Sequence, residues 1–218
     1  MSILFFSKIK NIFKYGLIFY TLFFSTTVFA HPHSWVDTNT YIHSNDTHIT
    51  SLYMTWTFDA ETSLYMLQGE DMSAGEKTKT LQRLAEGVVN NMYNEHYFTY
   101  FYLLDTPVRY KMARYPQLTQ IQDKLILSFE VPLSEPIKFA NNTFKLFIYD
   151  STYYVDMSWL NDSEIKLSQA LNERCTGKVI APDVSQGLRD FTLTLAEDVT
   201  PNNELGEHFS QQFKLTCK

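Results

Sequence analysis

The chain is expected to fold as an α+β domain: a mostly antiparallel β-sheet or sandwich with one long amphipathic helix packed on a face. Two observations predict this class. Short runs of β-branched and aromatic residues, separated by turn sequences, fill most of the chain after residue 30. One long segment between Ser73 and His96 instead repeats its apolar residues at helical spacing. No repeat or linker divides the sequence, which favours a single domain.

The first predicted elements are two strands that pair as a hairpin. Residues 49–58 alternate apolar and polar side chains, which is typical of a half-buried strand. Residues 33–42 are the expected partner strand, and residues 44–47 supply turn chemistry between them. Folding the hairpin about Asn45 and Asp46 would bring positions 58–60 across from positions 31–33.

Two helices are expected next. Residues 60–67 form a short helical piece after Asp59, and a long helix follows. Ser73 and Glu76 have the S-x-x-E spacing of a capping box, which predicts the start of that helix. Its apolar stripe runs as far as His96.

The rest of the chain is expected to form short strands. Turn sequences such as residues 105–107 and 140–142 separate them. The predicted strands are residues 97–104, 109–115, 124–131, 144–150, 153–159, 164–168, 191–196 and 212–217.

The N-terminus has the layout of a secretory signal. Lys8, Lys10 and Lys14 precede a charge-free apolar run over residues 15–24, and Val28 and Ala30 occupy the −3 and −1 positions of a cleavage site. The apolar run is well short of the roughly 20 residues that span a bilayer. We therefore expect residues 1–30 to be removed and residues 31–218 to form an exported domain without a membrane anchor.

The expected mature chain is acidic. Without the three leader lysines, 15 Lys and Arg residues stand against 24 Asp and Glu residues, a net charge of −9. This charge argues against nucleic acids and anionic membrane surfaces as partners, and it favours cations.

The two cysteines, Cys175 and Cys217, are expected to form a disulfide, because an even count in an exported chain usually means one. Closing this loop would contribute roughly 4 kcal/mol in the chain-entropy model. The alternative is that they serve as thiolate metal ligands.

Cleavage after Ala30 would leave His31 with a free α-amine, followed by Pro32 and His33. Residues two apart on a strand point to the same side, so both imidazoles can reach one ion. Pro32 has no amide proton to lose, which blocks the square-planar backbone mode of copper and nickel. Tetrahedral zinc, or a copper brace of one amine and two imidazoles, remains. The alternative is a frayed terminus that binds metal only as a histidine tag would.

A zinc site usually takes three or four protein ligands, so others must come from elsewhere in the chain. The further candidates are Asp59, Asp150 and His96. Each has a structural alternative. Asp59 is placed to cap the following helix, and Asp150 is placed to make local hydrogen bonds in a turn. His96 is placed to occupy the core or the last turn of a helix.

Five motifs together resemble a bacterial family, domain-of-unknown-function family 1007: residues 31–33, 56–59, 97–99, 149–156 and 216–217. The resemblance implies the periplasmic component of an uncharacterised transport system, similar to ZevA-type zinc accessory proteins. It also implies proximity to permeases for zinc, nickel or cobalt. Many members carry an EF-hand-like loop before the long helix. Residues 69–76 lack its spaced oxygen ligands, so no calcium site is expected here.

The function expected from these residues is periplasmic binding of a divalent metal ion, with Zn²⁺ first and Ni²⁺, Co²⁺ and Cu²⁺ as alternatives. The protein would act as an accessory or buffer for an inner-membrane permease. One alternative is a copper-binding histidine-brace redox protein, and another is a metal-free interaction module built on the abundant aromatic residues. No hydrolase elbow, phosphate loop or H-E-x-x-H helix appears, so no catalytic residues are expected.

Overall fold

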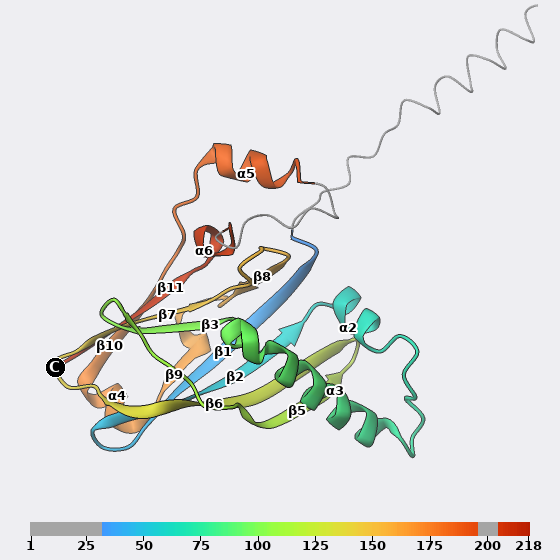
Figure 1. Ribbon diagram of the computed structural model, residues 1–218, viewed down its shortest axis with the longest axis horizontal. Helices are drawn as coiled ribbons and strands as arrows, with labels where there is room; N and C mark the ends of the chain where they lie inside the picture. Colours follow the sequence, from blue (N-terminus) through green and yellow to red (C-terminus); the bar gives the residue numbers. More distant parts are fainter. Residues whose placement is uncertain (1–31, 196–204) are drawn as a thin grey trace, which may run out of the picture.

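The computed structural model describes residues 32–195 and 205–218, so the predicted signal peptide and His31 lie outside the described residues. Two β-sheets pack face to face, and helices lie around them (Figure 1). Among the helices of the described ranges, none is both long and apolar enough to cross a membrane.

Sheet A is built around the predicted first hairpin. β1 (Ser34–Ser44) pairs antiparallel with β2 (His48–Phe58), and two short later strands pair with β1 in parallel. The order is β5 (Arg114–Ile121), β6 (Lys124–Lys138), β2, β1 and β8 (Val155–Ser158), with β9 (Ile165–Leu167) also paired with β1.

Sheet B is antiparallel throughout. Its order is β10 (Cys175–Ile180), β11 (Gln212–Cys217), β7 (Thr143–Ile148), β3 (Thr99–Leu103) and β4 (Thr106–Pro107). Cys175 and Cys217 face each other in the register of β10 and β11 and form the predicted disulfide.

One hydrophobic core fills the space between the sheets. Trp56 of β2 meets Phe129 of β6 edge to face, with ring centroids 4.9 Å apart. Phe101 of β3 stacks on Phe144 of β7 at 5.4 Å. All four side chains are at most 2 % exposed and belong to the same cluster. The predicted α+β class with mostly antiparallel strands is therefore confirmed.

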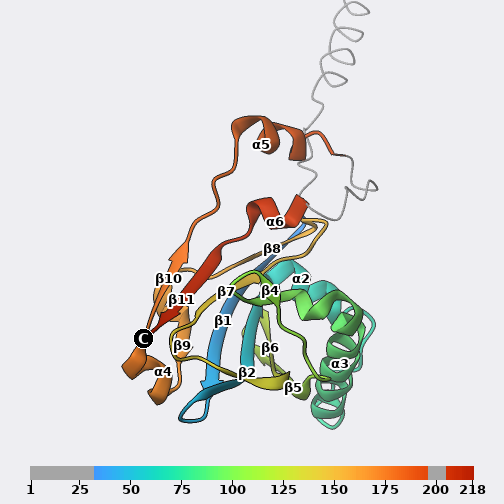
Figure 2. The same cartoon turned by 60° about the vertical axis from the view of Figure 1, so that its left-hand side comes forward.

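The helices lie at the ends and edges of this core. They are α2 (Ala60–Met66), α3 (Lys77–Asn91), η1 (Met92–Phe98), η2 (Asp162–Glu164), α4 (Gln169–Arg174), α5 (Gln186–Thr192) and α6 (Leu205–Phe209). Leu81, Ala85 and Val89 of α3 are buried, and this helix contacts the edge strand β5. Figure 2 shows α5 and α6 at the end of the molecule where β8 lies.

The predicted boundaries of the long helix are wrong. The helix begins at Lys77, and no side chain caps its first turn, so Ser73 and Glu76 do not form a capping box. Glu76 instead contacts the Lys79 ammonium at 3.0 Å. The helix ends at Asn91, and His96 lies beyond it with a φ of 52°. Helical spacing of apolar residues therefore continues past the point where the backbone leaves the helix.

Two predicted strands are also wrong. Within residues 109–115, Tyr110 makes an isolated bridge with Leu133, and β5 begins only at Arg114. Residues 186–192 form α5, because the Ser185 hydroxyl accepts a hydrogen bond from the Leu188 amide and caps a helix there. The last residue of the predicted strand over residues 191–196 lies outside the described part.

Candidate functional site

The start of β1 is where the structure gathers most of the predicted ligands. The His33 amide donates a hydrogen bond to the Tyr154 carbonyl at 2.9 Å. The rings of the two residues lie 4.7 Å apart between centroids. His33 is thus held beside the loop that leads into β8. His31 lies outside the described residues, so its distance from His33 stays untested.

Asp59 lies across from Trp35, whose carbonyl accepts a hydrogen bond from the Asp59 amide at 3.0 Å. The expected pairing of positions 58–60 with positions 31–33 is therefore wrong. The turn lies later than expected, closed by the Asn45 amide donating to the His48 carbonyl at 3.0 Å, and a register shift follows between His43 and Ser44. Together they move the pairing along β1.

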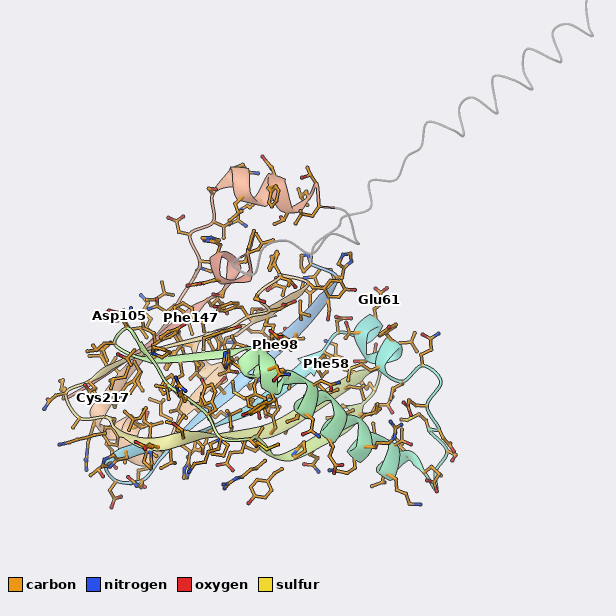
Figure 3. All side chains as sticks on the ribbon, in the orientation of Figure 1. Phe58, Glu61, Phe98, Asp105, Phe147 and Cys217 are labelled. Carbon is orange, nitrogen blue, oxygen red and sulfur yellow. A yellow bond between two sulfur atoms is a disulfide. The ribbon has the colours of Figure 1, made fainter. Side chains whose placement is uncertain are left out.

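The Asp59 carboxylate holds β1 against α2. It accepts hydrogen bonds from the Trp35 amide at 2.8 Å and from the Thr62 amide and hydroxyl at 2.8 and 2.7 Å. Burial acts to raise the pKa of Asp59, but these hydrogen bonds outweigh burial and lower the pKa below its ordinary value. The residue thus caps α2, between the labelled Phe58 and Glu61 of Figure 3. In addition, it positions the first residues of β1.

Asp150 is a buried carboxylate, 8 % exposed, that organises the loop before β8. It accepts hydrogen bonds from the amides of Thr152, Tyr154 and Val155 at 3.0, 3.0 and 3.2 Å, and from the Thr152 hydroxyl at 3.0 Å. Its oxygens are occupied by donors of its own loop. Because Tyr154 also holds His33, Asp150 fixes the support on which His33 rests.

Close packing of α6 adds to this support. The Gly206 amide donates to the Ser151 carbonyl at 3.0 Å. A Cβ at Gly206 would lie 1.7 Å from the Asp150 carbonyl oxygen, so only glycine permits this approach. The loop before β8 is therefore held from both sides, by its own aspartate and by α6.

His96 belongs to a different part of the molecule. It is exposed at the end of η1, and its ring lies 6.2 Å from that of Tyr100 in sheet B. The structure therefore places it beside β3, whereas His33, Asp59 and Asp150 surround the start of β1.

Asp156 is a residue of interest that the predicted set left out. In the parallel pairing of β1 and β8 it lies beside Trp35. Val155 and Met157 pack on the core, so Asp156 points to the opposite face, where Trp35 is 52 % exposed. Burial raises the pKa of Asp156, and within the described ranges its carboxylate makes no hydrogen bond or ion pair. The alternation of residues 155–157 is the sequence signal that identifies it.

No group of three or more His, Cys, Asp or Glu side chains that could hold a metal ion occurs within residues 32–195 and 205–218. A metal site at the start of β1 would therefore combine His33 and Asp156 with donors outside those ranges. The nearest such donors in the sequence are the imidazole and backbone nitrogen of His31.

Comparisons with known proteins agree on one family. The family described as "Protein of unknown function (DUF1007)" matches residues 16–217. An uncharacterized protein of Haemophilus influenzae is 33 % identical over 202 residues, which cover 90 % of this chain and 96 % of that relative. The resemblance seen in the sequence motifs is therefore confirmed over nearly the whole chain.

Proposed function

Because the chain belongs to the DUF1007 family of proteins of unknown function, we propose its role from its own residues: periplasmic binding of a divalent metal ion, zinc before nickel, cobalt or copper. It buffers the ion or passes it to an inner-membrane permease. The observation that carries the proposal is the fixed position of His33 beside β8, two residues after His31 in the sequence.

The support beneath His33 favours a binding role. Its peptide is bound to Tyr154, the Tyr154 amide is bound to Asp150, and Asp59 secures the next residues of β1. A ligand whose surroundings are already ordered loses less conformational freedom when an ion binds. Asp59 and Asp150 therefore act here as positioning residues, and His33 acts as the ligand.

Asp156 is the second proposed ligand. The register places His33 beside Tyr154 and Asp156 two residues further along the same face of the sheet. A partly buried carboxylate without a hydrogen-bond donor is destabilised in its charged form, and a nearby cation would offset that cost. One imidazole and one carboxylate are ordinary zinc ligands.

The remaining donors would come from the new N-terminus that cleavage after Ala30 creates. The His31 imidazole and α-amine would complete a tetrahedral zinc site, with Pro32 excluding the backbone amide mode. Ligands on a chain terminus release an ion readily, which suits a protein that hands its metal on. The acidic mature chain also favours cation capture.

The test is calorimetric titration of zinc, nickel, cobalt and copper into protein whose N-terminus has been verified as His31. We expect one-to-one zinc binding that weakens about tenfold or more in His33→Ala and in Asp156→Asn. His43→Ala is the matched control, because this exposed histidine contacts Thr50 at the other end of the same strand. Its affinity should equal that of the parent protein.

Equal zinc affinity in His33→Ala and the parent protein would overturn the proposal. Preference for copper, together with redox cycling, would favour the histidine-brace alternative in its place. Loss of affinity in His43→Ala to the same extent as in His33→Ala would show only the diffuse binding of scattered histidines.

A further inference from the structure

A cavity of about 690 Å³ lies among η1, β3 and the segment that follows β4. Its lining residues fall between Tyr93 and Tyr110, so it is formed by a different part of the chain from the start of β1. The volume is in the range of sites that hold small organic ligands, roughly 300–1,000 Å³.

Tyrosine dominates the wall of the cavity. Five tyrosines line it: Tyr93, Tyr97, Tyr100, Tyr102 and Tyr110. Two of them pack against neighbours on the same face of sheet B, since the ring of Tyr100 stacks on that of Tyr149 at 4.2 Å and the ring of Tyr102 meets that of Phe147 at 6.1 Å between centroids. Figure 3 labels Phe147, which packs on Tyr102, and Phe98, the last residue of η1 before β3. Tyr97 is buried, and its hydroxyl is already hydrogen-bonded to the Ala113 amide. The other four tyrosines can offer apolar ring faces to a planar ligand and hydroxyls at their tips.

The phenols of Tyr100 and Tyr110 keep their protons at neutral pH. Burial raises the pKa of Tyr100 to about 12, helped by the carboxylates of Glu95 and Asp150. Burial also raises the pKa of Tyr110. The Tyr110 hydroxyl is buried beside the Phe101 backbone and, in the described part of the chain, lacks a hydrogen bond of ordinary geometry. The cavity wall thus retains hydrogen-bonding capacity that the fold does not use.

Arg109 supplies a positive charge to the lining. The imidazole of His96 also lines the cavity, and among the described residues no aspartate or glutamate does so, although the carboxylates of Glu95 and Asp150 lie near enough to Tyr100 to help raise its pKa. Within residues 32–195 and 205–218, the Arg109 guanidinium has no ion-pair partner and no hydrogen-bonded acceptor. A guanidinium without such partners can donate two parallel hydrogen bonds to two oxygens of a carboxylate or sulfonate.

The backbone at the cavity is strained. His96, Tyr97 and Phe98 have φ angles of 52°, 57° and 49°, three consecutive non-glycine residues in the left-handed region. Each costs about 1 kcal/mol or more. The bend is held by the Ala113 amide, which donates to the Tyr97 hydroxyl at 2.8 Å, and by the Thr99 hydroxyl, which donates to the Tyr97 carbonyl. Strain of this kind clusters at ligand-binding sites.

We propose that this cavity binds a small organic anion with a planar aromatic body, the ring lying among the tyrosines and the anionic group on Arg109. Three features of the described residues carry the inference: the tyrosine-lined volume, the unpaired guanidinium, and the strained segment that forms one wall. The site needs no metal, so it stands or falls separately from the proposed metal site.

The test uses a matched pair of fluorescent probes, the anion 1-anilinonaphthalene-8-sulfonate and its uncharged analogue N-phenyl-1-naphthylamine. Both are titrated into the full mature protein in the presence of a chelator, which removes any contribution of bound metal. We expect saturable one-to-one binding of the sulfonate and at least about tenfold weaker binding of the neutral probe.

Two pairs of variants locate the site. Arg109→Gln should weaken sulfonate binding about tenfold. Arg114→Gln should leave it unchanged, because Arg114 is also an exposed arginine but lies on β5, outside the cavity lining. Tyr93→Ala should weaken binding about threefold, and Tyr115→Ala should not. Tyr93 and Tyr115 are 50 % and 72 % exposed, so neither change should unfold the protein, and thermal melting checks this.

Absence of saturable sulfonate binding would overturn the proposal. It would also be overturned if both probes bound equally, or if Arg109→Gln and Arg114→Gln had the same effect, because the anion would then have no defined partner. Binding that is lost in Arg109→Gln alone, with unchanged thermal stability, supports it.

Discussion

The start of β1 and the cavity beside β3 use polar groups in opposite ways. At the start of β1, the carboxylates of Asp59 and Asp150 are filled by hydrogen bonds from neighbouring amides and hydroxyls. At the cavity, in the described part of the chain, the Arg109 guanidinium and the Tyr110 hydroxyl lack such partners, and the backbone is strained. At the start of β1, Asp59 and Asp150 therefore hold the backbone around the proposed ligands His33 and Asp156, whereas the unbonded groups at the cavity belong to its own wall.

The largest change in stability is expected on replacing Asp150, because its buried carboxylate accepts the most hydrogen bonds in the loop before β8. Asp150→Ala leaves the buried amides of the loop before β8 without an acceptor, and we expect the free energy of unfolding to fall by about 3 kcal/mol. Urea denaturation followed by circular dichroism measures it. A loss below 1 kcal/mol would show that the loop does not depend on this carboxylate.

Asp156→Asn is the matched control and should act in the opposite direction in metal-free protein. The pKa of Asp156 is raised in the folded state, so its ionisation lowers stability as the pH rises from the ordinary value of 3.8 through the raised pKa. Asparagine does not ionise, so the variant does not lose this stability. Above the raised pKa of Asp156 the variant should have a larger free energy of unfolding than the parent protein, and below pH 3.8 the two should be equal.

A smaller effect is expected at the contact between α6 and the loop. Gly206→Ala places a Cβ against the Asp150 carbonyl, which should lower the free energy of unfolding by about 2 kcal/mol. Gly87→Ala is the control, since open space surrounds Gly87 in α3 and alanine favours a helix by about 1 kcal/mol. Thermal denaturation should shift the two variants in opposite directions, and a shared direction would contradict the packing argument.

The smallest effect is expected at the strained bend. His96→Gly should raise the free energy of unfolding by about 1 kcal/mol relative to His96→Ala, because glycine tolerates a φ of 52° and alanine does not. Comparing the two variants at one exposed position separates strain from loss of the imidazole. Chemical denaturation of both should rank glycine above alanine; equal stability would mean that the bend is not strained.

Sequence patterns located the hairpin of β1 and β2 and most strands of both sheets, because alternation records which face of a strand is buried. The same patterns did not predict where a helix ends or which weakly buried segments form strands. Nothing in the periodicity marks the end of α3 at Asn91, since the predicted apolar stripe continues to His96, where the backbone has already turned left-handed. The strand β10 was missed because half of it is exposed and its partner β11 is distant in sequence.

Some residues of the candidate site were predicted from the sequence, and others were not. The structure brings His33, Asp59 and Asp150 to one end of β1, although the register expected for Asp59 was wrong. His96 lies elsewhere, and Asp156 was left out of the predicted set because its position beside Trp35 depends on the parallel pairing of β8 with β1. The alternation of residues 155–157 indicates its face, but pairing between strands so far apart in sequence leaves no local signal.

That parallel pairing also sets the order in which the molecule can assemble. The hairpin of β1 and β2 joins segments close in sequence. Among the described strands, the ones that cover the outer edge of β1 are β8 and β9, more than a hundred residues later in the chain. Until those strands arrive, β1 offers a row of unpaired amides and carbonyls to any other extended chain. Contacts between distant residues also slow folding. A chain that is still folding is therefore most exposed to aggregation along β1, the strand that the finished protein covers with two short partners.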